Sequence, residues 1–299
     1  MTARAGLVAP TADPSAGNRR GAVFMVLAMA AFAVEDAFLK SATTLVAAPS
    51  AMMGFGLLGV AIFVAVAVLR GEAPVPRLTR GLLVRSVFEL GGRLFYSLAL
   101  AYATLGATSA ILQATPLVVV AGAVVVFGER VGWRRWLAIG VGLGGVLLIL
   151  RPDAGGLDAA AVFAVLGMLG FAGRDLATRA APLNVTNAQL GVLGMSVLAL
   201  AGLVVQAATG APLVVPPPLA LAQIGGAALF GCLAYAALTV AMRSGEVSVV
   251  TPFRYTRLVF ALILATTLFG ERPDLPMLLG SALIVGSGLF TLARARRMV

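Results

Sequence analysis

The sequence of 299 residues contains no histidine, a single cysteine (Cys232) and a single lysine (Lys40). Without histidine, the common zinc sites and the serine–histidine form of nucleophilic catalysis lack their parts. One cysteine excludes an intramolecular disulfide and is most simply a small buried apolar residue. The chain also lacks the Gly-x-x-x-x-Gly-Lys sequence of a P-loop motor. We therefore predict no metal site, no cofactor and no catalytic residues.

Charge is scarce as well. Only 11% of the residues are charged, 60% are apolar and the mean hydropathy is +1.01, whereas about a quarter of the residues in soluble proteins are charged. These values predict an integral membrane protein. The net charge of +10 would suggest nucleic acid as the partner of a soluble chain, but in a membrane protein basic loops set the orientation. The predicted partner is the lipid bilayer, with no nucleic acid.

Apolar stretches of about 20 residues, bounded by proline, glycine and charge, predict transmembrane helices. They lie near residues 21–43, 49–69, 80–101, 105–127, 134–150, 159–181, 187–208, 219–242, 247–269 and 275–293. Residues 1–20 have no apolar run and are predicted to form a flexible cytosolic tail.

Basic residues in the loops predict the orientation of these ten helices. With the N-terminus in the cytosol, 14 arginines of the tails and loops fall on the cytosolic side and two, Arg151 and Arg272, on the outer side. A missed or additional helix would mix the two groups, so the imbalance supports the helix count and predicts that both termini are cytosolic.

An internal duplication relates the two halves of the chain. The segment 26–42 returns at 165–181, a spacing of 175 − 36 = 139, with 7 of its 17 positions identical. A Phe-Gly-Glu-Arg sequence occurs at 127–130 and again at 269–272, a spacing of 269 − 127 = 142. Because each repeat contains five helices, an odd number, the second repeat enters the membrane from the opposite side. We predict inverted repeats at 21–150 and 159–293, an architecture in which solutes bind near the midplane between the repeats.

The repeats, the apolar-Gly-Glu-Arg sequences after the fourth and ninth helices, and the sequence Thr-Pro-Phe-Arg-Tyr-Thr-Arg-Leu at 251–258 resemble the EamA-type branch of the drug/metabolite transporter superfamily. The resemblance covers residues 20–295. It implies an all-α membrane protein of the bacterial inner membrane that transports a small molecule by alternating access. Within the branch the chain is similar to exporters of metabolites and amino acids, including aromatic amino acids. A passive channel and, with less support, a membrane-embedded enzyme are the alternatives; the oligomeric state is unknown.

Ionisable residues inside the spans are candidates for function, because a charge at a helix centre costs roughly 2.5–3.5 kcal/mol on insertion scales. Arg254 and Arg257 lie three residues apart in the ninth span, which contains no acid. Arg257 is 257 − 247 = 10 residues from the start of this span, and so about 15 Å deep in a hydrocarbon core of about 30 Å. We predict that Arg257, helped by Arg254, binds a carboxylate of the solute. A structural ion pair with Glu89 or Glu35 is the alternative.

Other polar residues complete the predicted binding site. Glu89 and Arg93 lie four residues apart and can neutralise each other, either as a structural pair or beside the solute. Tyrosines deep within the spans would suit a partly apolar solute. Pro116 is expected to loosen the fourth span, with a simple packing kink as the alternative. Its counterpart, 116 + 142 = 258, is a leucine, so this proline is not repeated in the ninth span. The predicted solute-binding residues are Arg257, Arg254, Glu89, Arg93, Glu35, Tyr96, Gln113 and Tyr255.

The duplicated segment carries an aspartate followed four residues later by a base in both copies. Asp36 precedes Lys40, and Asp175 precedes Arg179. Because the two helices run in opposite directions, one pair lies toward the outside and the other toward the cytosol. We predict that these pairs close two gates in turn. The alternative is that each aspartate holds its own base near the membrane surface.

Overall fold

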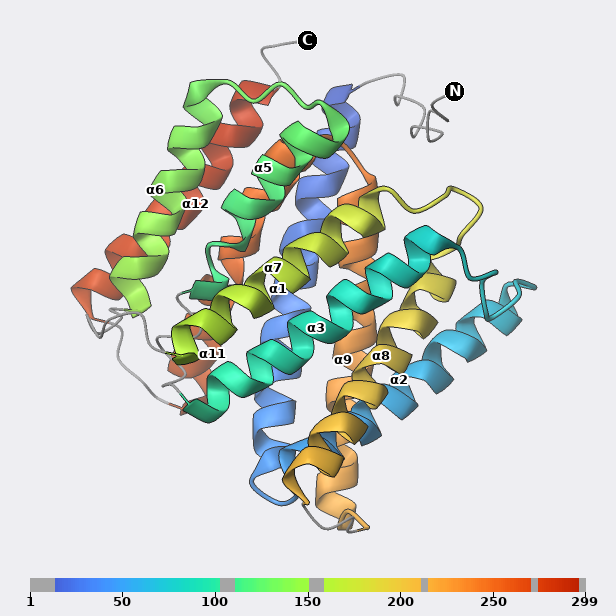
Figure 1. The fold of residues 1–299 in the computed structure, drawn as a ribbon. Helices are drawn as coiled ribbons and strands as arrows, with labels where there is room; N and C mark the ends of the chain where they lie inside the picture. The colour runs from blue at the N-terminus through green and yellow to red at the C-terminus, as the bar shows by residue number, and fades with distance from the viewer. Residues whose placement is uncertain (1–13, 103–110, 151–158, 211–214, 270–273, 296–299) are drawn as a thin grey trace.

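The computed structural model describes residues 14–102, 111–150, 159–210, 215–269 and 274–295, and in these ranges the chain is built from helices and turns without a strand (Figure 1). The all-α prediction is therefore confirmed, and the helices follow the apolar stretches of the sequence. They are α1 (Pro14–Thr43), α2 (Ala48–Leu69), α3 (Arg80–Tyr102), α5 (Thr115–Phe127), α6 (Trp133–Leu150), α7 (Ala159–Arg179), α8 (Asn187–Thr209), α9 (Pro218–Arg243), α10 (Val247–Val250), the 3-10 helix η1 (Thr251–Tyr255), α11 (Thr256–Phe269) and α12 (Leu275–Ala295).

The major helix contacts all connect one repeat to the other. α1 packs on α9, α3 on α7, α2 on α8 and α6 on α12. Exchanging the repeats converts the α1–α9 pair into the α7–α3 pair and leaves the other two pairs unchanged, as an inverted repeat requires. Glycines allow the closest approach in one of these pairs, since a Cβ atom on Gly170 of α7 would lie 2.5 Å from Cα of Gly92 in α3. The ten spans thus form two interlocked five-helix repeats.

Two spans are interrupted, one in each repeat. A turn at residues 113–114 precedes α5, which has Pro116 in its first turn. In the ninth span, η1 separates α10 from α11 and has Pro252 near its start. The repeat spacing places Gln113 on Tyr255 (113 + 142 = 255), the last residue of η1. The prolines are therefore not at equivalent positions, as the sequence indicated, but the irregular backbone recurs in both repeats.

The first helix begins earlier than the sequence suggested. α1 starts at Pro14, so residues 14–20, expected in the tail, extend the first span; residues 1–13 lie outside the described ranges. Asn18 is 2% exposed, and its side-chain oxygen accepts a hydrogen bond from the backbone N–H of Glu246 at 2.7 Å. This long-range contact fixes the first turns of α1, which local composition could not reveal.

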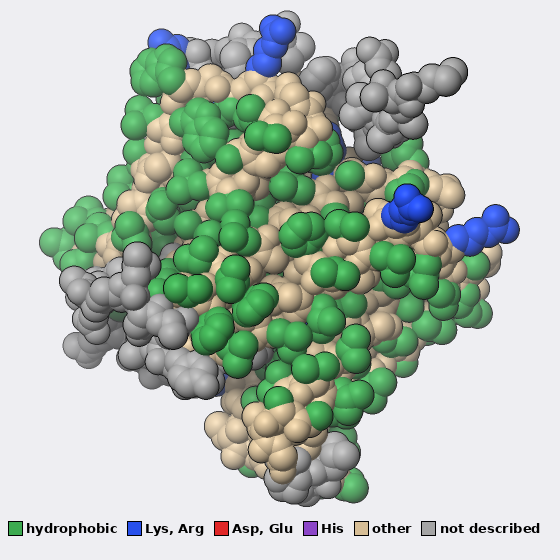
Figure 2. All heavy atoms as spheres, in the orientation of Figure 1, with side chains coloured by type: hydrophobic (Ala, Val, Ile, Leu, Met, Phe, Trp, Pro, Cys, Tyr) green, Lys and Arg blue, Asp and Glu red, His purple; other side chains and the backbone are tan. Residues whose placement is uncertain are grey.

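The outer surface is apolar over its middle. Figure 2 shows hydrophobic side chains spread over the helices of one face, with lysine and arginine visible toward its upper part. Among the described residues, α1, α2, α7, α8 and α9 are each long and apolar enough to cross a membrane. Exposed large side chains such as Leu57, Val87 and Leu229 would face lipid in that setting.

Candidate functional site

Both duplicated aspartates lie beside arginines of the ninth span. Arg257, at the start of α11, forms a two-pronged contact with Asp36 of α1: its Nε lies 3.0 Å from Oδ2 and its Nη2 lies 2.6 Å from both carboxylate oxygens. Arg254, in η1, lies with Nη2 2.5 Å from Oδ2 of Asp175 in α7. The interrupted span therefore contacts the equivalent acid of each repeat, and its arginines have the partners that their own helix could not provide.

The two pairs differ in their access to solvent. The side chains of Arg257 and Asp36 are 38% and 51% exposed, whereas those of Arg254 and Asp175 are 13% and 1% exposed. The Arg257 guanidinium also lies over the ring of Phe32, 5.1 Å from its centroid, a cation–π arrangement. The Asp36–Arg257 pair is thus the solvent-accessible one of the two.

Glu89 of α3 is the common partner of a buried cluster. Its side chain is fully buried, and its oxygens lie 3.3 Å from Arg85, 3.4 Å from Arg93 and 3.6 Å from Arg174. Tyr235 of α9 donates its hydroxyl to Glu89 at 3.0 Å and accepts a hydrogen bond from Arg85. The predicted Glu89–Arg93 contact within α3 is confirmed, and Glu89 also joins α3 to α7 through Arg174 and to α9 through Tyr235.

Arg174 links this cluster to the other repeat's aspartate. Its guanidinium donates to Oδ1 of Asp175 through Nε at 3.0 Å and Nη2 at 2.8 Å, while Nη1 approaches Glu89. Asp175 in turn pairs with Arg254. Breaking a buried pair by removing one partner typically destabilises a protein by about 3–5 kcal/mol, so this continuous chain of charges ties the ninth span to the core.

Several predicted site residues gather around the accessible pair. Glu35 and Tyr96 lie close enough to Arg257 and Asp36 for their charges to interact, and Arg93 lies close enough to interact with Glu35. The ring of Tyr96 packs edge-on against Phe171, with centroids 6.2 Å apart. Carboxylates, guanidinium groups and aromatic rings therefore meet where α1, α3 and α11 face one another.

The central charges do not cancel. The arginines are 85, 93, 174, 254 and 257, and the acids are 35, 36, 89 and 175, which leaves 5 − 4 = 1 positive charge when every group is ionised. A net positive charge inside an apolar bundle favours a bound anion. The arrangement can therefore bind a carboxylate or a similar group.

Other predicted residues lie elsewhere or have other partners. Tyr255 is fully buried against Val146 and Ile284, between α6 and α12, and not beside the accessible pair. Lys40 is exposed and does not pair with Asp36. Arg179 donates to the backbone oxygen of Met242 at 3.4 Å instead of pairing with Asp175. The predicted aspartate–base contacts within each helix are thus replaced by contacts between helices.

Gln113 keeps its predicted position beside a helix interruption. It lies half-buried in the turn that precedes α5. Because irregular backbone inside a membrane protein is tolerated where it borders protein or a water-filled space, this turn remains a reasonable part of a binding region.

Three residues of the buried cluster, Arg85, Arg174 and Tyr235, were missed by the sequence analysis as members of the site. Arg85 is 1% exposed and contacts Glu89, Tyr235 and, at 3.0 Å, the hydroxyl of Thr178. Its spacing of 89 − 85 = 4 from Glu89 is the same signal that indicated Arg93. Tyr235 had no such local signal, because its partners come from α3.

A second polar network lies at the end of the bundle where α1 begins and α12 ends, here called the termini end (Figure 1). It surrounds the turn between α9 and α10. Glu129 accepts hydrogen bonds from the backbone N–H groups of Val247 at 2.9 Å and Ser248 at 3.1 Å. Arg135 pairs with Glu246 and donates to the Ser248 hydroxyl at 3.0 Å. With the Asn18 contact, this termini-end network holds α1, α6 and the segment after α5 against the ninth span.

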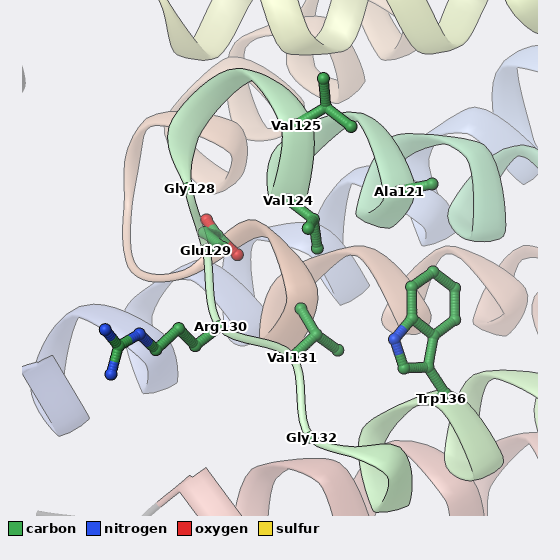
Figure 3. A pocket seen from close by; sticks show the side chains of 9 residues that line it. All are labelled: Ala121, Val124, Val125, Gly128, Glu129, Arg130, Val131, Gly132 and Trp136. Atoms are coloured by element: carbon green, nitrogen blue, oxygen red, sulfur yellow. The ribbon is translucent and has the colours of Figure 1, made fainter.

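One pocket of the structure is part of this end and not of the central clusters. It has a volume of about 730 Å³ and lies between α5 and α6, open to the surface. Figure 3 shows Trp136 facing Ala121 and Val131 across it, with Glu129 and Arg130 on the connecting segment. Because it shares no residue with the central ion pairs, we do not assign the solute to it.

Two interlocked inverted repeats, interrupted spans and buried charges between the repeats define the class of membrane transport proteins. Sequence comparison gives the family: the EamA-like transporter family matches residues 19–151 and 158–293, and the chain belongs to it. The two matched segments correspond to the two repeats.

Two relatives are transporters by name, and a solved structure has the same fold. The chain is 28% identical over 285 residues to a riboflavin transporter of Rhizobium johnstonii, covering 93% of this chain and 92% of that protein. It is 27% identical over 222 residues to an S-adenosylmethionine uptake transporter of Rickettsia bellii, covering 74% of each. A crystal structure with 20% identity superposes with a TM-score of 0.78 over 93% of this chain and 99% of the other. That last likeness concerns the fold alone.

Proposed function

We propose that this EamA-family transporter is a secondary carrier of amino acids, including aromatic ones, that works by alternating access and exports its solute. The observation that carries the proposal is the Asp36–Arg257 pair. It is accessible, it joins the two repeats, and its arginine presents a planar fork that a carboxylate can bind through two oxygens.

The surroundings of this pair favour an amino acid as the solute. The excess positive charge of the central clusters suits the carboxylate, and Asp36 offers negative charge to an ammonium group. The rings of Phe32 and Tyr96 suit a flat, apolar substituent. Riboflavin and S-adenosylmethionine, the solutes named for two relatives, both carry flat heteroaromatic rings, and the second is an amino acid. Because of this shared chemistry, a transport assay of the protein should include both compounds.

Alternating access is supported by the different states of the two ends. The termini-end network closes one end, while the Asp36–Arg257 pair remains accessible. In this proposal Asp36 and Asp175 contribute to opposite gates, with Arg257 and Arg254 as their partners. In this proposal the termini end lies in the cytosol of a bacterial-type inner membrane, which the distribution of basic loop residues supports, and the described state is open outward.

Counterflow in proteoliposomes tests the proposal. Vesicles loaded with unlabelled solute should transiently concentrate external labelled solute, because a carrier exchanges one molecule for another, whereas a channel only equilibrates them. The panel should contain phenylalanine, tyrosine, tryptophan, an aliphatic amino acid, riboflavin and S-adenosylmethionine. Arg257→Lys serves as the matched variant, since it keeps the charge and loses the fork. Equilibration without counterflow would indicate a channel, and counterflow of riboflavin alone would contradict the amino-acid assignment.

A further inference from the structure

Glu35 is a buried acid without a cationic partner. It directly precedes Asp36 in α1, it is 8% exposed, and it forms no ion pair or hydrogen bond with another residue in the described ranges. A charged carboxylate in such a place is unfavourable unless it is paired. Glu35 therefore differs from Asp36, Glu89 and Asp175, each of which contacts at least one arginine.

The groups around Glu35 do not provide a cation to pair with its carboxylate. A Cβ atom on Gly231 of α9 would lie 3.5 Å from its carboxyl carbon, and the ring of Phe55 reaches the same glycine. The titratable and charged groups within electrostatic range are Asp36 on the same helix, Arg257 on α11, Arg93 on α3 and Cys232 on α9. Asp36 holds Arg257, and Glu89 contacts Arg93. Taking up a proton is the remaining way for Glu35 to avoid an unpaired buried charge.

The second repeat has a base at the position equivalent to Glu35, so symmetric packing of the repeats does not require an acid there. The counterpart of Glu35 is Arg174 (35 + 139 = 174), which is held by Asp175 at 2.8 Å and Glu89 at 3.6 Å. One repeat thus has a firmly paired cation where the other has an unpaired acid. The difference leaves Glu35 free to change its charge while the ion pairs of Asp36, Glu89 and Asp175 stay in place.

We propose that Glu35 is the binding site for the proton that drives transport, a role that rests on the carrier function proposed above. A carboxylate oxygen of Glu35 takes a proton from water on one side of the membrane, and the O–H bond breaks to release that proton to water on the other side. One proton is carried for each conformational cycle, and no other reactant is consumed. Because Glu35 adjoins the acid that holds Arg257, its charge affects the same contact that receives the solute.

Gradient-driven transport in proteoliposomes separates this role from solute binding. With a 1:1 ratio, a gradient of about one pH unit should concentrate the solute about tenfold in wild type. Glu35→Gln mimics the protonated form permanently, so it should lose this accumulation. Whatever its counterflow rate without a gradient, that rate should no longer depend on pH, whereas the wild-type rate should. Glu72→Gln, in the loop after α2, is the matched control and should keep both activities. Glu35→Asp should retain a response to the gradient and covers the case in which Glu35→Gln does not fold.

The outcomes distinguish the two proposals. If Glu35→Gln still accumulated the solute fully in response to the gradient, Glu35 would not be the proton site. The same conclusion would follow if the wild-type protein showed counterflow but no response to the gradient. In both cases the carrier function would stand. Infrared spectroscopy of the purified protein provides a test without any solute. At neutral pH we expect a protonated-carboxyl band in wild type that is missing in Glu35→Gln, and identical spectra would refute the assignment even if no solute of the panel were transported.

Discussion

Replacing Arg257 by alanine should abolish most transport while leaving the fold nearly intact. The Asp36–Arg257 pair is 51% and 38% exposed, so water screens it, and its contribution to the free energy of unfolding is about 0–1 kcal/mol. A loss of that size shifts the melting temperature of a protein of this size by no more than about 2–4 °C. For binding, the loss of a charge-assisted contact to a carboxylate is worth about 1.5–3 kcal/mol. We therefore expect about 10–100-fold weaker solute binding.

The buried cluster provides the contrast that makes this prediction specific. Arg174 is 10% exposed at its side chain and contacts both Glu89 and Asp175. Removing it would leave two buried acids with fewer cations, at a loss of about 3–5 kcal/mol. Arg174→Ala should therefore lower the melting temperature clearly, whereas Arg257→Ala should not, although both variants remove one guanidinium group from the same region.

Two measurements decide the matter. Thermal unfolding in detergent reports stability, and initial counterflow rates per amount of inserted protein report transport. Arg257→Lys should fall between wild type and Arg257→Ala, because it keeps the charge but loses the two-pronged geometry. The sequence suggested Glu89 or Glu35 as the structural partner of Arg257, but the structure identifies Asp36. If the double variant Arg257→Ala/Asp36→Asn recovered transport, Arg257 would serve the scaffold and not the solute.

Three further predictions concern topology and gating. In a cysteine-free background, a cysteine at Ala73 should not react with an impermeant reagent on intact cells, and labelling there would overturn the predicted orientation. Asp36→Asn and Asp175→Asn should shift the accessibility of one central cysteine toward opposite sides, because each removes contacts of one gate; identical shifts would contradict the gate assignment. Glu129→Gln removes the charge of a side chain that accepts hydrogen bonds from two backbone N–H groups, and hydrogen bonds to a charged group contribute about 1.5–3 kcal/mol. A cysteine at the buried Ser248 should therefore become more reactive in this variant. Unchanged reactivity would show that the Glu129 contact does not close the termini end.

The sequence predicted the fold well because the relevant signals are local. Apolar length, basic loops and the duplicated segment are each readable along the chain, and the spans and the repeat arrangement follow from them. Boundaries that depend on distant contacts were less accurate. Nothing near residues 14–20 announces a helix, since the residue that fixes Asn18 is Glu246, 246 − 18 = 228 positions away.

Ion-pair partners were the least predictable feature. Spacing of four residues suggested that Asp36 would hold Lys40, but a lysine near a helix end reaches water easily and needs no partner. An arginine in the middle of a span cannot reach the water at the membrane surface, so Arg257 pairs with Asp36 instead. Partner choice therefore depended on which cation lacked water, a property of the assembled bundle. Glu89 with Arg93 was predictable because both groups lie on one helix.

The arginines of the ninth span also bear on how such a chain could evolve. Their acids are duplicated, but their own counterparts in the fourth span are Leu112 (254 − 142) and Thr115 (257 − 142). In an ancestral homodimer of five-helix subunits, any arginine added to one subunit would appear in both, giving four cations for two aspartates. Only after gene duplication could one copy acquire the bases while the other kept uncharged residues. The present set of contacts is therefore accessible to two copies that differ in sequence and closed to their symmetric ancestor.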